Sequence, residues 1–96
     1  MTQALTRSEI ETLCQTVAKK WTPASDHQTI TQTFKFKDHY ATMAFVNAVA
    51  WISHQHDHHP EMVVGYNTCT VTYSTHEVNG LSHKDFDCAA LIDQWF

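Results

Sequence analysis

The chain has 96 residues, of which 43% are hydrophobic and 17% charged, with only two glycines and two prolines. This composition predicts one packed globular domain over residues 1–96 and excludes a disordered or fibrous chain. The formal net charge of −4, with histidine neutral, argues against a nucleic-acid partner and against attraction to anionic lipid.

Targeting and redox signals are also weak. No apolar run reaches the ~18 residues of a membrane span, and the start MTQALTRSEIE has no apolar secretory segment. The three cysteines, Cys14, Cys69 and Cys88, are far apart and form no Cys-x-x-Cys motif, so free thiols in a reducing compartment are expected. We therefore expect a cytoplasmic protein with no membrane partner.

The first predicted element is an amphipathic helix over about residues 8–20. Its apolar positions recur at i, i+3, i+4 and i+7, namely at Ile10, Leu13, Cys14 and Val17. Capping-box spacing occurs twice, in Thr6 with Glu9 and in Ser8 with Glu11, so either pair is a candidate start. The segment around Pro23 ends the helix.

A strand is expected from about residue 29 to residue 36, because the hydrophobic period changes to two. Ile30, Phe34 and Phe36 share one face with Gln32 as the exception, and the other face is rich in threonine. A short extra strand is expected near His27.

A second helix is predicted over about residues 39–55, with Asp38 as its N-cap. It is too apolar for a one-sided surface helix, so we expect it to be the central helix of the core. It must stop before Pro60, which places His58 and His59 at a helix exit that leads into a strand.

Two further strands, at about residues 62–64 and 68–74, are separated by Gly65 and Asn67 and predict a hairpin. Ser82 with Asp85 has cap spacing for a last helix that continues to the C-terminus.

The predicted fold is α+β: an antiparallel four-stranded sheet with three helices packed on one face, in the order helix-strand-strand-helix-strand-strand-helix. The threonine-rich strand faces leave the other side of the sheet open.

The anomaly in the composition is its eight histidines, four of which, His54, His56, His58 and His59, fall within six positions. Imidazole both donates and accepts protons near neutral pH, so this cluster indicates acid/base machinery, a metal site or a solvated helix end. His54 and His58 have i, i+4 spacing and His76 is a possible third ligand, but nothing completes a metal site. We expect no metal and no cofactor.

The stretch from His54 to Asp85 resembles the signature of the pterin-4a-carbinolamine dehydratases. In that family an acidic, Lys or His position precedes a His-His-Pro motif, and an aromatic, a His and an Asp follow at fixed spacings. The matching positions here are His54, His58, His59, Pro60, Tyr66, His76 and Asp85. The segments HHPE, STHE and GLS are also similar, so the likeness covers nearly the whole chain. Relatives often carry an acidic residue at His54 and a large aromatic at Met62.

The resemblance implies a hydro-lyase that converts 4a-hydroxytetrahydrobiopterin, or another 4a-hydroxytetrahydropterin, to quinonoid dihydropterin and water in tetrahydrobiopterin recycling. It implies general acid/base catalysis by histidine, with His58 and His76 in the proton transfers and His59 in binding. Glu61 and the segment Ser74, Thr75 and His76 would bind the pterin. Pro60 and Asp85 would support the site, although Asp85 has the alternative role of capping the last helix.

Two other functions remain open. One is a non-catalytic pterin-binding protein or a transcriptional coactivator that assists dimerisation. The other is a dehydratase-like protein that acts on another pterin, such as one in molybdopterin metabolism.

The last helix also predicts assembly. Its apolar residues exceed what one buried face needs, and they are Phe86, Ala89, Ala90, Leu91, Ile92, Trp95 and Phe96. Together with the open sheet, this surplus predicts a homo-oligomer, either a dimer or a tetramer.

Overall fold

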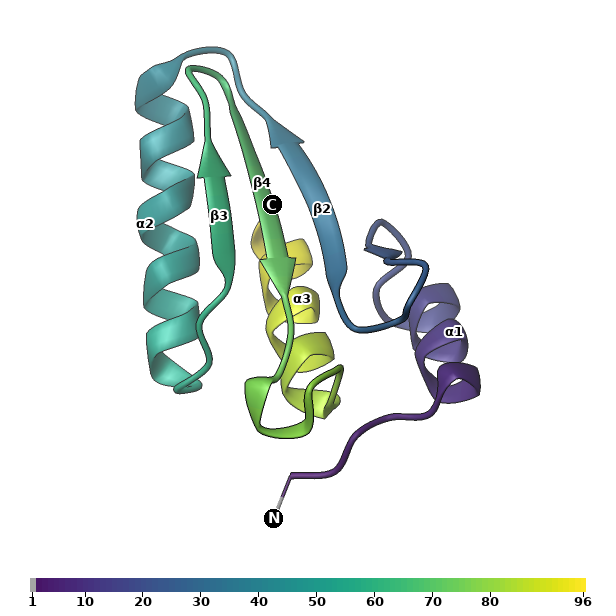
Figure 1. Ribbon diagram of the computed structural model, residues 1–96. Helices are drawn as coiled ribbons and strands as arrows, with labels where there is room; N and C mark the ends of the chain where they lie inside the picture. The colour runs from purple at the N-terminus through teal and green to yellow at the C-terminus, as the bar shows by residue number, and fades with distance from the viewer. Residues whose placement is uncertain (1) are drawn as a thin grey trace.

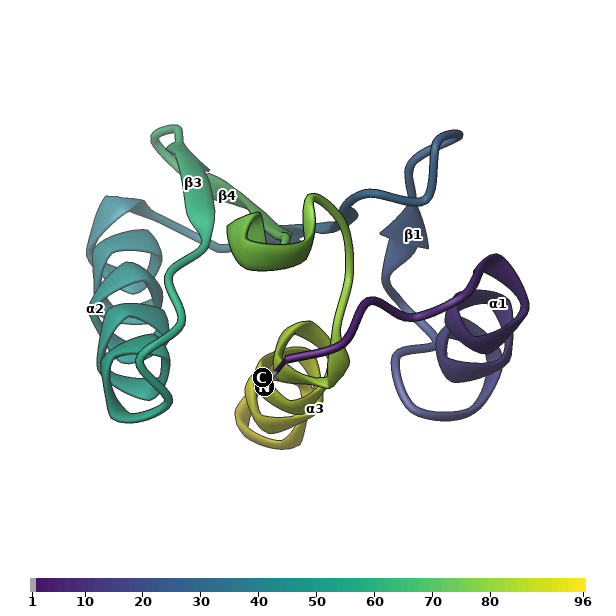
Figure 2. The same ribbon diagram turned by 60° about the horizontal axis from the view of Figure 1, so that its bottom comes forward.

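The computed structural model describes residues 2–96 (Figure 1). Its elements are α1 (Arg7–Thr16), β1 (Thr22–Pro23), β2 (Ile30–Lys35), α2 (His39–Gln55), β3 (Glu61–Val64), β4 (Thr68–Tyr73), the short 3₁₀ helix η1 (His76–Val78) and α3 (His83–Trp95). The strands form one antiparallel sheet in the order β1-β2-β4-β3, and the three α-helices lie on one side of it (Figure 2). The predicted α+β architecture is therefore confirmed.

The central helix is α3, which lies between α2 and α1 in Figure 2. The prediction that α2 would be central is wrong. Only one stripe of α2 is buried, with Phe45 and Val49 at its middle, whereas Tyr40 and Trp51 on other faces are exposed. Because α2 lies at one side of the helix layer, no other element within residues 2–96 covers its remaining apolar surface.

The helix-free face of the sheet carries threonine pairs. Thr31 and Thr72 lie opposite each other on β2 and β4 with their hydroxyl oxygens 3.1 Å apart, and the Thr33 and Thr70 hydroxyls are 2.9 Å apart. Such cross-strand pairs stabilise an antiparallel ladder without needing a covering layer. The expectation of helices on one side only is confirmed.

Helix α1 begins with the first of the two candidate caps. The Glu9 carboxylate accepts the Thr6 N–H at 2.8 Å, and the Thr6 hydroxyl accepts the Glu9 N–H at 3.2 Å. The bond from the Thr6 backbone stabilises the ionised form and lowers the pKa of Glu9. The helix ends at Thr16 rather than at the expected residue 20, because the chain turns there to bury Ala18 in place of Val17.

The extra strand is β1, which pairs Thr22 with Thr31 and Pro23 with Ile30. It therefore lies upstream of the expected position. His27 occupies the turn between β1 and β2, where its φ of 57° is in the left-handed region.

Gln32, the exception in the alternation of β2, has a polar partner on the helix side of the sheet. Its side-chain amide donates to Asp93 Oδ1 of α3 at 3.1 Å. The indole N–H of Trp21 lies 3.1 Å from each oxygen of the same carboxylate. Asp93 thus joins β2 and the segment after α1 to the central helix.

We predict that Asp93→Ala lowers the free energy of unfolding by about 1–3 kcal/mol, because two partly buried donors lose their acceptor. Urea denaturation measures the change. Gln94→Ala, an exposed position on the same helix, is the control. Equal stability of the two variants would contradict the assigned role of Asp93.

Candidate functional site

His58 is placed by the way α2 ends. The Asp57 N–H donates to the His54 carbonyl at 3.1 Å, and the His58 N–H donates to the Ser53 carbonyl at 2.9 Å. Asp57 has a φ of 49°. These two bonds around a left-handed residue form a Schellman motif, in which glycine usually takes the position held here by Asp57. The motif turns the chain sharply and directs His58 back toward the protein interior.

The His58 side chain is nearly buried, at 8% exposure, and it has two defined neighbours. Its Nε2 lies 2.5 Å from Asp85 Oδ1 of α3. Its ring lies nearly parallel to that of Tyr73 on β4, with centroids 5.7 Å apart and planes 10° apart. The expectation that the histidine pair lies at a helix exit leading into a strand is confirmed, with β3 beginning at Glu61.

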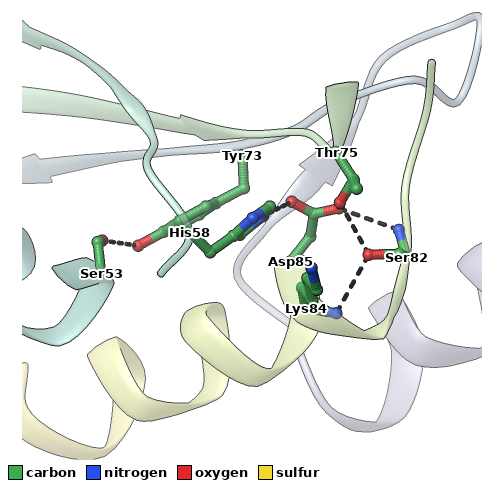
Figure 3. A network of polar contacts seen from close by, with 7 residues as sticks. All are labelled: Ser53, His58, Tyr73, Thr75, Ser82, Lys84 and Asp85. Atoms are coloured by element: carbon green, nitrogen blue, oxygen red, sulfur yellow. Dashed lines mark hydrogen bonds and ion pairs between the residues drawn. The ribbon is translucent and has the colours of Figure 1, made fainter. Parts of the chain in front are cut away.

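Asp85 is fully buried and accepts hydrogen bonds at both carboxylate oxygens (Figure 3). Oδ1 is bonded to His58, while Oδ2 accepts the Thr75 hydroxyl at 2.7 Å and the Ser82 N–H at 3.0 Å. The Thr75 and Ser82 hydroxyl oxygens are 2.8 Å apart. Because the single hydroxyl proton of Thr75 goes to Asp85, Ser82 donates in this bond. Asp85 therefore caps α3 and also contacts His58, so the two alternatives for this residue hold together.

This geometry assigns the protonation of the His58 ring. An ionised carboxylate only accepts hydrogen bonds, so Nε2 of His58 carries the proton that is shared with Asp85. In the neutral imidazole the lone pair then lies on Nδ1. Nδ1 is consequently the ring nitrogen that can exchange a proton with a bound molecule.

The other candidates lie at the same end of the sheet, where β3 begins and β4 ends. His59 and His76 are exposed; His59 immediately follows His58, and His76 begins η1 directly after Thr75. Glu61 lies opposite Thr72 in the β3–β4 pair, so its side chain shares the helix-free face. Pro60 is half-buried between His59 and β3.

A cavity of about 170 Å³ adjoins the segment from Ser74 to His76. It brings together three of the predicted binding residues with residues from the turn before β2 and the end of η1. The full lining is Gln28, Thr29, Ser74, Thr75, His76, Asn79 and Gly80. Gly80 belongs to the GLS segment, whereas Gln28, Thr29 and Asn79 carry no sequence pattern that distinguishes them from ordinary turn residues.

Two positions of the motif lie outside this arrangement. Tyr66 is in the turn between β3 and β4, where its carbonyl accepts the Thr42 hydroxyl at 2.9 Å and its ring stacks on His39. His54 is exposed on the last turn of α2 beside Trp51. Within residues 2–96, no group of three or more His, Cys, Asp or Glu side chains is arranged to hold a metal ion.

The Schellman turn gives a stability prediction. Asp57→Val should lower the free energy of unfolding by about 1–2 kcal/mol, because a β-branched side chain is strained at positive φ. Asp57→Gly should not lower it, since glycine adopts this conformation freely. Chemical denaturation of the two variants measures the difference, and equal losses would show that the conformation of residue 57 does not matter.

The chain was compared with known proteins. The family described as "Pterin 4 alpha carbinolamine dehydratase" matches residues 3–95. A Nitrosomonas eutropha protein named "Putative pterin-4-alpha-carbinolamine dehydratase" is 54% identical over 89 residues, which span 93% of this chain and 77% of that protein. A protein of the same name from Legionella pneumophila strain Corby is 48% identical over 91 residues, or 95% of this chain and 80% of that one.

Two solved structures are similar in fold. The "transcriptional coactivator/pterin dehydratase" of Brucella melitensis has a TM-score of 0.89 and 32% identity, and the match covers 96% of this chain and 97% of that one. A pterin dehydratase-like RuBisCO assembly factor of the alpha-carboxysome has a TM-score of 0.68 at 22% identity, covering 78% of this chain and 87% of that one. The second match shows the shared fold alone.

The helix-covered antiparallel sheet and the HHP and STHE motifs together define a dehydratase-like α+β protein. The chain belongs to the pterin 4 alpha carbinolamine dehydratase family. No helix within residues 2–96 is both long and apolar enough to cross a membrane.

Proposed function

We propose that the protein is a cytoplasmic hydro-lyase that dehydrates 4a-hydroxytetrahydropterins to quinonoid dihydropterins by histidine acid/base catalysis, with 4a-hydroxytetrahydrobiopterin as the substrate. The observation that carries this proposal is the buried hydrogen bond between His58 Nε2 and Asp85 Oδ1. A carboxylate on one ring nitrogen fixes the tautomer and stabilises the imidazolium, which prepares the other nitrogen for proton transfer. Family membership supports the same class of reaction.

The reaction needs two proton transfers. Hydroxide is a poor leaving group, so an imidazolium protonates the oxygen on C4a and the C–O bond breaks as water departs. A base takes the proton from the ring nitrogen whose lone pair forms the new C=N bond. We assign these transfers to His58, through Nδ1, and to the exposed imidazole of His76. General acid/base groups of this kind supply ~10²–10⁴-fold in rate.

Binding is proposed for the polar surface beside these groups. Ser74, Thr75 and His76 adjoin the 170 Å³ cavity. Backbone groups of Ser74 and His76 are proposed to bind the amide and amino edge of a pterin, because the N–H and carbonyl of Thr75 are bonded to Gly80. His59 and Glu61, which precede and begin β3, do not line this cavity, and we propose that they bind the substrate from the β3 side of β4. Thr75 also bonds to Asp85, so the binding segment and His58 are held by the same carboxylate.

We predict that His58→Ala or His76→Ala lowers the turnover number by ~10²-fold or more, because each substitution removes one proton-transfer group. A stopped-flow assay that follows the loss of 4a-hydroxytetrahydropterin measures it. His56→Ala and His83→Ala are matched controls, since both side chains are exposed at helix ends, and neither is bonded to Asp85 or lines the cavity. Small and equal losses in all four variants would show that the cluster is not the site.

We also propose that the protein assembles through the outer surface of α2 and α3. Trp51, Trp95 and Phe96 are 62%, 69% and 52% exposed. They line a groove of about 580 Å³ between the two helices, together with Leu91 and Ile52. An apolar surface of this kind on a small protein favours an interface with a second copy.

Assembly predicts a mass above that of one chain in light scattering coupled to size exclusion at micromolar protein. Trp95→Glu should dissociate the assembly, because a charge in a desolvated interface is unfavourable. Lys84→Glu, an exposed substitution at the other end of α3, is the control. A mass near 11 kDa that persists on concentration would refute the proposal.

A further inference from the structure

An aromatic ring lies against one face of His58. Tyr73 is the last residue of β4 and is fully buried. Its ring plane is within 10° of the His58 plane at a centroid separation of 5.7 Å, which is an offset stacked arrangement. His58 is therefore restrained on its face by Tyr73 and along its edge by Asp85.

Ser53 contacts both members of this stack. Its carbonyl accepts the His58 N–H at 2.9 Å, and its hydroxyl oxygen lies 2.7 Å from the Tyr73 hydroxyl oxygen. Figure 3 shows the resulting chain of side chains from Ser53 through Tyr73 and His58 to Asp85. Ser53, a buried residue of α2, thus holds both the backbone of His58 and the hydroxyl end of the Tyr73 ring.

Packing alone does not require these two hydroxyls. A buried hydroxyl pair must satisfy itself to offset desolvation, whereas two apolar side chains of similar shape would be close to neutral for stability. Every buried side-chain nitrogen or oxygen in the described part of the chain has a hydrogen-bond partner. The Ser53–Tyr73 bond therefore fixes the orientation of the two side chains and contributes little to the free energy of unfolding.

We propose that Tyr73 and Ser53 are positioning residues for His58: they hold the imidazole plane so that Nδ1 points in one direction while Asp85 holds Nε2. This inference rests on the proposed proton transfer by His58. Neither residue touches the reacting atoms in this assignment.

The Tyr73 phenol that stacks on His58 is uncharged. Burial raises the pKa of Tyr73, so the phenol keeps its proton at neutral pH. Burial likewise raises the pKa of the neighbouring Cys88 thiol to about 11. The two side chains that contact the His58 ring are thus the Asp85 carboxylate and the uncharged Tyr73 phenol.

The kinetic test uses Tyr73→Leu, which removes the ring, and Tyr73→Phe, which keeps it. Tyr73→Leu should lower kcat on the order of 10- to 100-fold with KM nearly unchanged, because His58 loses its orientation but the binding segment stays in place. Tyr73→Phe should restore most of the loss. Phe45→Leu is the control, a buried aromatic truncation among Phe34, Phe36 and Phe96, and its kcat should equal that of the parent.

Ser53→Ala provides a milder variant that keeps the carbonyl contact to His58. It should lower kcat by the same factor as Tyr73→Phe, because both substitutions remove the same hydrogen bond. The double variant Ser53→Ala with Tyr73→Phe should be no slower than either single variant, since coupled residues are not additive. If the kcat losses of the two single variants add in the double variant, Ser53 and Tyr73 do not act on His58 through their shared hydrogen bond.

A spectroscopic measurement separates this inference from the proposed function. The ¹⁵N and ¹H signals of the His58 ring report its tautomer without any substrate. Asp85 keeps the Nε2–H tautomer in all three proteins. We expect narrow ring signals in the parent protein and in Tyr73→Phe, and exchange-broadened ring signals in Tyr73→Leu, where the imidazole plane is no longer held. Unchanged ring signals and unchanged kcat in folded Tyr73→Leu would overturn the positioning role. A parent protein that is inactive in the dehydration assay would overturn the proposed function instead.

Discussion

The Asp85 carboxylate is the group on which the fold and the candidate site both depend. It is fully buried in a chain of 96 residues, and a buried charge costs several kcal/mol unless hydrogen bonds replace its hydration. Its three donors come from three segments: His58 after α2, Thr75 after β4 and Ser82 before α3. The hydrogen bonds that satisfy this charge therefore also hold the three segments together at one end of the sheet.

The helix ends around this group make its position favourable. Asp85 lies in the first turn of α3, where the helix dipole favours a negative charge, and His58 follows the last turn of α2, where the dipole favours an imidazolium. Two helix termini of opposite polarity thus converge on one hydrogen-bonded pair. This convergence requires the abrupt exit from α2 at Asp57, because a longer helix would direct His58 away from the sheet.

Much of this arrangement could be predicted from local patterns, and the rest depends on tertiary contacts. The alternation of β2 and β4, the hairpin and the Ser82–Asp85 cap are encoded in neighbouring residues. The roles of Ser53 and Tyr73 are not, because a serine in an apolar helix and a tyrosine in an alternating strand are typical of ordinary core positions. Periodicity likewise identified the apolar surface of α2 but not what covers it, so the central helix was assigned wrongly.

The buried polar network and the exposed aromatic residues have a common physical origin in the small size of the domain. At one end of the helix layer, interior volume is taken by His58, Asp85, Thr75 and Ser82, which contribute little apolar burial. A chain of this length buries only a little over ~60% of its unfolded surface, so a polar interior leaves less apolar area to stabilise the monomer. Trp51 and Trp95 carry apolar area that folding leaves exposed. Covering it with a second copy would recover burial that the polar network around Asp85 excludes from the core, which links the proposed assembly to the proposed acid/base site.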